Sequence, residues 1–144
     1  MGDRCYVEIT VRRQDLAKWE NLGYTDGDSE LVNTGEVKSY VSMYDSERNY
    51  GVNHDTDDVV SGCPMFGSHS SGGDYGAYLF AWDGETFKQI ETNHDGELLV
   101  KVNPSNGQPS EYDLAHVRSF LEFSRKVGQL VGRAPLWCND ALDD

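Results

Sequence analysis

Three short runs of β-type residues, separated by Asp-Gly turns, constrain the fold of this chain more than any other feature. The runs are AYLFAWD (77–83), TFKQIET (86–92) and ELLVKVN (97–103). The connections DGE (83–85) and NHDGE (93–97) both contain Asp-Gly, which is the strongest short-range signal for a hairpin. The pattern therefore predicts a three-strand antiparallel meander in the C-terminal half of the chain.

The N-terminal part of the chain predicts two further strands and a short helix. CYVEITV (5–11) alternates between apolar and polar residues, as a half-buried strand does. EVKSYVSMYD (36–45) alternates in the same way and places Tyr40 and Tyr44 on one face. Between these two strands, apolar residues recur at helical spacing, which predicts a helix over about 13–22.

A long helix is predicted over SEYDLAHVRSFLEFSRKVGQLVG (110–132). Ser110 and Asp113 have the spacing of a capping box, with Asp in place of the usual Glu. The apolar and small residues of this segment recur on one helical face, which predicts that this face packs on the core. They are Leu114, Val117, Phe120, Leu121, Ser124, Val127, Gly128 and Val131.

The order of these elements predicts the fold class. CPMFGSHSSGGDYG (63–76) is rich in glycine and serine and predicts a long loop. Residues 1–144 are then expected to form a single α+β domain with a mainly antiparallel sheet that includes the C-terminal three-strand meander. A short N-terminal helix and a long C-terminal helix packed on one face complete this expected fold.

The charge of the chain is strongly negative and unevenly distributed. Its 144 residues include 25 acids and 12 bases, a formal net charge of −13. Residues 19–87 hold 13 of the acids, only Lys38 and Arg48 as bases, and six of the eight tyrosines. Such a field repels nucleic acid and attracts basic protein surfaces. We therefore expect a basic protein partner and no direct binding to nucleic acid.

The apolar runs, the N-terminal segment and the cysteines of the sequence indicate a cellular compartment. No apolar run approaches the roughly 18–20 residues that cross a bilayer, so no contact with a membrane is expected. The N-terminus lacks the apolar stretch of a secretory signal. The three cysteines are an odd number without a CxxC pair, which disfavours a disulfide framework and a zinc knuckle. The expected location is the cytoplasm.

The leading functional hypothesis is a non-enzymatic acidic binding or inhibitor protein that covers a basic, nucleic-acid-binding surface of a protein partner. Carboxylates spaced over a surface can occupy a groove built for phosphates, because the same Lys and Arg side chains pair with both. In composition and size the chain is similar to inhibitors of host defence encoded by phages and mobile elements. The expected contact residues are Asp26, Asp28, Glu30, Tyr40, Tyr44, Asp45, Glu47, Tyr50, Asp55, Asp57 and Asp58.

Two alternatives belong to other classes of protein. One is an immunity protein that neutralises a toxin enzyme by the same electrostatic complementarity. The other is a small metal-dependent hydrolase built around His54, His69 and the 61–76 loop.

The tripeptide Asn-His-Asp occurs at 53–55 and at 93–95, and only the first copy belongs to a cluster of acids. The second copy lies at an expected hairpin tip, where these residues serve the turn. The segments 45–56 and 26–37 both lack the Gly and Glu positions of a calcium loop. Cys63, six residues before His69, matches no protease signature. We therefore expect no cofactor, no metal site and no catalytic residue.

Overall fold

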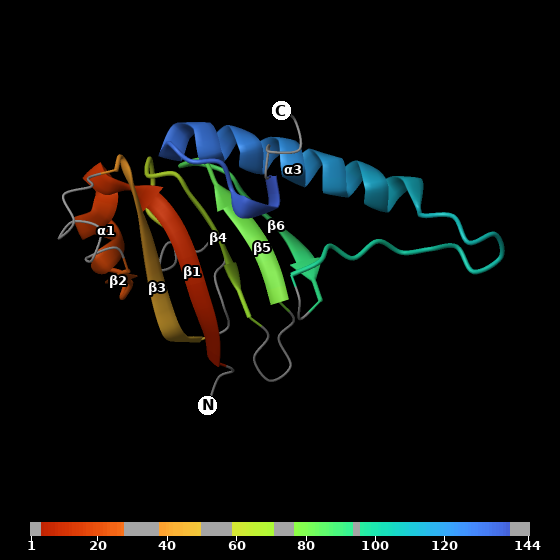
Figure 1. Cartoon of the computed structure of the whole chain (residues 1–144), viewed down its shortest axis with the longest axis horizontal. Helices are drawn as coiled ribbons and strands as arrows, with labels where there is room; N and C mark the ends of the chain where they lie inside the picture. Colours follow the sequence, from red (N-terminus) through yellow and green to blue (C-terminus); the bar gives the residue numbers. More distant parts are fainter. Residues whose placement is uncertain (1–3, 28–37, 50–58, 71–76, 94–95, 139–144) are drawn as a thin grey trace.

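The computed structural model describes residues 4–27, 38–49, 59–70, 77–93 and 96–138. Its strands form a six-stranded antiparallel sheet in the order β2-β3-β1-β4-β5-β6 (Figure 1). The strands are β1 (Arg4–Arg12), β2 (Thr25–Asp26), β3 (Tyr40–Asn49), β4 (Met65–His69), β5 (Ala77–Trp82) and β6 (Phe87–Thr92). The helical segments are η1 (Arg13–Asp15), α1 (Leu16–Glu20), α3 (Glu111–Val131) and η2 (Leu136–Cys138).

Alternation along β1 divides its side chains between the two faces of the sheet. Val7, Ile9 and Val11 are at most 1% exposed and belong to the largest core cluster. Trp19 of α1 is fully buried in the same cluster, so the short helix packs on this face of the sheet.

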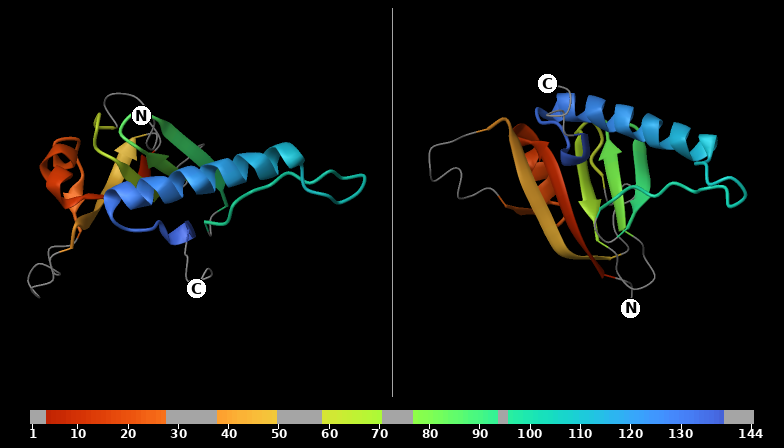
Figure 2. Two further views of the ribbon diagram at one scale, coloured as in Figure 1. Left: turned by 90° about the horizontal axis from the view of Figure 1, so that it is seen from above. Right: turned by 45° about the vertical axis from the view of Figure 1, so that its right-hand side comes forward.

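The long helix α3 packs on the opposite face of the sheet. Val127 and Val131 pack against Phe66 of β4 and Ala81 of β5, and Phe120 packs against the β5–β6 part of the sheet. Figure 2 shows α3 crossing the strands, with α1 at the far edge. The two helices therefore bury different faces of the same sheet.

Both ends of α3 are capped, and the cap at Ser110 is the one that the sequence predicts. The Ser110 side chain accepts a hydrogen bond from the Asp113 backbone N–H at 3.4 Å. Gly132 follows the last helical residue with φ 103° and donates to the Gly128 carbonyl. This left-handed conformation favours glycine and ends the helix.

The predicted α+β fold class is confirmed, and so is the hairpin around 83–85. The Asp83 carboxylate accepts from the backbone N–H groups of Glu85 and Thr86 at 2.8 and 2.7 Å. Gly84 has φ 105°, a conformation that the Asp-Gly signal anticipates. The predicted strand over 5–11 and the short helix near 13–22 also correspond to observed elements.

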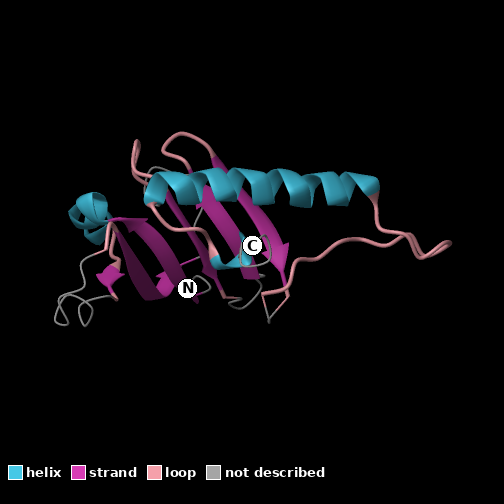
Figure 3. Ribbon diagram, turned by 45° about the horizontal axis from the view of Figure 1, so that its top comes forward, coloured by secondary structure: helices cyan, strands magenta, loops and turns pink. Residues whose placement is uncertain are grey.

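The predicted third strand of the meander, 97–103, is wrong. In this segment only Leu98 and Val102 make isolated bridges, and Leu99 and Val102 are 48% and 53% exposed. Figure 3 shows a loop that extends away from the sheet before α3 begins. Apolar composition did not produce a strand here because, although Leu98 packs against the cluster of Leu79, Ile90 and Phe120, the segment makes only two isolated bridges and no continuous ladder.

The predicted loop over 63–76 is wrong in part, because its first half contains β4. Four of the five residues of β4 are buried, and Ser68 is partly buried, so both faces of this strand are covered. A strand covered on both faces shows no alternation of apolar and polar residues, which is why its sequence resembles a loop. The meander therefore exists, but it consists of β4, β5 and β6.

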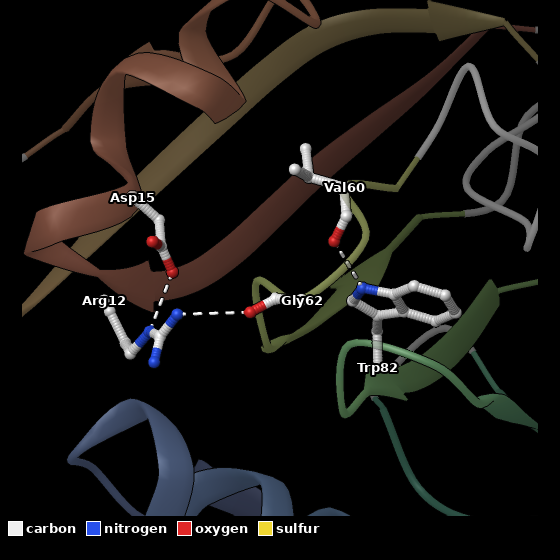
Figure 4. Close-up of polar contacts among 5 residues, drawn as sticks. All are labelled: Arg12, Asp15, Val60, Gly62 and Trp82. Carbon is white, nitrogen blue, oxygen red and sulfur yellow. Dashed lines mark hydrogen bonds and ion pairs between the residues drawn. The ribbon is translucent and has the colours of Figure 1, made fainter.

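Polar contacts fasten residues 59–64 to the end of β1 and to β5 (Figure 4). Arg12 donates from Nε to Asp15 at 2.8 Å and from Nη2 to the Gly62 carbonyl at 3.2 Å. The Trp82 indole N–H donates to the Val60 carbonyl at 2.9 Å. The Arg12 bond provides a donor for the Gly62 carbonyl, whereas the Val60 carbonyl also accepts from the Cys63 backbone N–H at 3.1 Å.

Candidate functional site

The structure describes part of the predicted contact set. Tyr40, Tyr44 and Asp45 lie on β3, and Asp26 lies on β2. For Glu47 only the backbone position on β3 is described. The predicted contact residues outside the described ranges are Asp28, Glu30, Tyr50, Asp55, Asp57 and Asp58.

The described members of the set lie on different faces of the sheet. Tyr44 pairs in register with Glu8, whereas Asp45 pairs with Val7, whose side chain is fully buried on the other face. Asp26 pairs with Met43, which belongs to that same buried face. The structure therefore brings Tyr44 together with Glu8 and separates it from Asp26 and Asp45.

Tyr44 belongs to an exposed cluster with Tyr6 and Glu8, which we call the tyrosine patch. The rings of Tyr6 and Tyr44 stack with centroids 6.3 Å apart and an interplanar angle of 12°. They are 43% and 37% exposed. The Tyr6 hydroxyl donates to the Glu8 carboxylate at 3.3 Å. Partial burial, and then the nearby negative charge of Glu8, raise the pKa of Tyr6, which therefore stays a neutral donor.

Sequence reasoning missed Tyr6 and Glu8 as members of the site. The alternation of residues 5–11 places both side chains on the polar face of the strand. Their proximity to Tyr44, however, depends on the antiparallel pairing of β1 with β3, which local pattern does not specify.

A hollow of about 440 Å³ lies beside the tyrosine patch on the same sheet face. Glu8 reaches it from β1, and Arg133 reaches it from the segment after α3. Leu136 and Trp137 of η2 form an apolar side of the hollow. The other lining residues include the hydroxyl groups of Thr10, Ser42 and Ser68. The hollow thus combines both signs of charge, hydroxyl groups and apolar surface.

Tyr40 is not an exposed anchor in this structure. Its side chain is half-buried and packs against the cluster that contains Val127 and Val131 of α3. The Arg133 guanidinium lies over its ring, 5.0 Å from the centroid. Tyr40 therefore joins β3 to the C-terminal end of α3.

The residues of the hydrolase alternative are only partly described. His54 lies outside the described residues, and His69 lies on β4, where it is 3% exposed. In the part of the chain that the structure describes, no three His, Cys, Asp or Glu side chains are grouped so as to hold a metal ion. Cys63 is buried, and burial, together with the nearby Asp15, raises the pKa of its thiol. A protonated thiol is a poor nucleophile.

His69 makes the stability of the core sensitive to acid. Its ring stacks on Phe80 with centroids 6.1 Å apart, and Nδ1 lies 3.1 Å from the Ser70 carbonyl oxygen. Burial lowers the pKa of His69 below its ordinary value. In the unfolded chain the same imidazole takes up a proton near pH 6.5, so the unfolded state gains protons first as the pH falls. The contribution of neutral His69 to stability is therefore complete above about pH 6.5 and is lost below it.

We expect the free energy of unfolding of the wild type to fall more steeply than that of His69→Phe between about pH 6.5 and 5. Urea unfolding followed by circular dichroism at several pH values measures both curves. Phenylalanine keeps the ring stacking but cannot bind a proton. Parallel curves for the two proteins over this range would contradict the assignment of neutral His69 to the core.

The excess negative charge belongs almost entirely to segments outside the described residues. The described residues contain 13 acids and 12 bases, which leaves 12 acids and no base for the rest of the chain. The body formed by the sheet and helices is therefore close to neutral, at a net charge of −1.

Comparisons with known proteins identified no relative of this chain. No protein-family model matches the chain, and no similar curated protein or solved structure was found. None of the described helices combines the length and the apolar character that crossing a bilayer requires.

Proposed function

We propose that the protein is a non-enzymatic binding or inhibitor protein that covers a basic, nucleic-acid-binding surface of a protein partner. The tyrosine patch carries this proposal. Two stacked, exposed rings beside a carboxylate form a preorganised contact surface, since tyrosine gives a large contact area at a small cost in side-chain entropy. Glu8 is placed to accept hydrogen bonds from lysine or arginine side chains of the partner.

The distribution of charge supports the same partner. Carboxylates without accompanying bases produce a field that attracts a basic surface and speeds the encounter, over a range of about 8 Å at physiological salt. The protein would then act as a nucleic-acid mimic, the role expected of an anti-defence protein from a phage or a mobile element. We place it in the cytoplasm, because the buried Cys63 is not part of a disulfide and such thiols persist under reducing conditions.

The first test compares capture of the partner by three forms of the protein. Tagged wild type, the double variant Tyr6→Ala/Tyr44→Ala and the control Tyr112→Ala are incubated with nuclease-treated lysate of the organism that carries the gene. Tyr112 is a matched control because it is 81% exposed and lies on the first turn of α3. We expect the double variant to bind the captured protein at least about thirtyfold more weakly, since the loss of even one aromatic hot spot costs about 2 kcal/mol or more.

Competition with DNA tests the identity of the surface that is covered. Added double-stranded DNA should displace the partner from the wild type, and moderate salt should release it. Equal capture by the wild type and the double variant would show that the tyrosine patch is not the contact surface. Capture that DNA leaves unchanged would show that the partner's nucleic-acid site is not covered.

A further inference from the structure

A cluster of three cations surrounds Tyr40 at the end of the sheet where β1 ends and β3 begins. The Lys38 ammonium and the Arg133 guanidinium both lie over the Tyr40 ring, 5.7 and 5.0 Å from its centroid. Arg13 donates to the carbonyls of Lys38 and Tyr40 at 2.6 and 3.3 Å. Because an aromatic ring attracts cations on its face, the Tyr40 ring holds Lys38 and Arg133 in place, whereas Arg13 is held by the two carbonyls.

These three cations have no carboxylate partner among the described residues. Elsewhere in the described chain, Arg12 pairs with Asp15 at 2.8 Å and Lys126 pairs with Glu122 at 3.6 Å. Within the described part of the chain, these three cations form a local positive site, although the net charge of the whole chain is −13. At physiological salt, charges more than about 8 Å away are largely screened, so nearby charges have the largest effect on binding there.

Arg133 connects this cluster to the hollow described above. Its position follows from the end of α3, where the Arg133 backbone N–H donates to the Gly128 carbonyl at 3.0 Å. The side chain lines the hollow together with Leu136 and Trp137. The Trp137 indole N–H donates to Ser124 at 3.0 Å, which fixes the orientation of its ring.

We infer that the hollow binds a small organic anion whose single carboxylate or phosphate headgroup lies against Arg133 and whose apolar body lies against Leu136 and Trp137. Arginine matches both headgroups, because its guanidinium donates two parallel hydrogen bonds. The volume of about 440 Å³ lies in the range of small-molecule sites. Glu8, which also lines the hollow, disfavours a second anionic group on the ligand. The site shares Glu8 with the tyrosine patch, but the inference does not rest on the proposed partner contact.

The test is a titration followed by two-dimensional ¹H–¹⁵N NMR of the full chain without any partner. The probes are phenylacetate, phenyl phosphate, inorganic phosphate and the uncharged benzyl alcohol. We expect saturable shifts of the Trp137 indole peak, assigned with Trp137→Phe, with a Kd on the order of millimolar for ligands of this size. A response to phenylacetate alone would identify a carboxylate headgroup, and a response to phenyl phosphate alone would identify a phosphate headgroup.

Three variants decide whether the inferred contacts are correct. Arg133→Met should weaken binding of the anionic probes about tenfold, because a charge-assisted hydrogen bond is lost. Arg118→Met, at an exposed position of α3, should leave it unchanged. If Arg133→Met does not fold, Leu136→Asp replaces it, since Leu136 is 76% exposed and a new carboxylate there should repel the anion. Each of three results would overturn the inference. They are no saturable shifts, binding of benzyl alcohol as tight as that of the anions, and unchanged binding in Arg133→Met or, if that variant does not fold, in Leu136→Asp.

Discussion

Replacing Gly67 with alanine is expected to destabilise the protein by more than about 3 kcal/mol or to prevent folding. Gly67 lies on β4 opposite Ile9 of β1, at the centre of the sheet. A Cβ atom at this position would collide with the Glu8 carbonyl oxygen and come within 2.9 Å of the Ile9 Cα. Both obstacles are backbone atoms of a paired strand, so relief requires β1 and β4 to separate.

Urea unfolding of Gly67→Ala beside Ser68→Ala measures this effect. Ser68 is the next residue of β4 and faces the hollow, so its truncation should change the free energy of unfolding by less than about 1 kcal/mol. A Gly67→Ala protein that folds with nearly wild-type stability would show that β1 and β4 do not approach each other as described.

Replacing Arg12 with methionine is expected to destabilise the protein by about 3 kcal/mol. The change removes the guanidinium that lies 2.8 Å from Asp15, whose side chain is only 4% exposed. A buried carboxylate without its cation keeps its full desolvation cost. The change also removes the donor to the Gly62 carbonyl, which loosens the loop before β4.

Two further variants isolate the cause of this loss. Lys126→Met breaks the ion pair between Lys126 and Glu122, whose side chains are 70% and 71% exposed. This change should lower the free energy of unfolding by less than about 1 kcal/mol. Arg12→Met/Asp15→Asn removes the charge that Arg12→Met leaves unpaired, so it should be more stable than Arg12→Met alone. Thermal and urea unfolding give these differences. Equal losses for Arg12→Met and Lys126→Met would contradict the buried pair.

The sequence was most informative where a single face of an element is buried. The polar-apolar alternation of β1 and the helical stripe of α3 are local consequences of one-sided burial, and both elements form as predicted. It was least informative for β4, which is buried on both faces, and for 97–103, where Leu99 and Val102 remain exposed. In both cases the outcome depends on long-range packing.

Predicting the candidate site requires knowledge of which strands pair, and the local sequence pattern does not contain this information. Tyr44 could be placed on the polar face of its strand from sequence, but Tyr6 meets it only because β1 pairs with β3. The predicted grouping of Tyr44 with Asp45 could not persist on a strand, because successive side chains point to opposite faces. Arg133 reaches the hollow because α3 ends beside Tyr40.

The most direct measurement of the proposed function is the salt dependence of partner affinity for two charge-reversal variants with the same net charge. One is Asp55→Lys/Asp57→Lys/Asp58→Lys, within the predicted contact set. The other is Glu20→Lys/Glu85→Lys/Glu122→Lys, at exposed positions of α1, the β5–β6 turn and α3. We expect the first variant to lose binding at all salt concentrations and the second to lose mainly the electrostatic increase in association rate. Equal affinities and equal salt slopes for the two variants would show that only total charge matters, and would contradict a specific acidic contact surface.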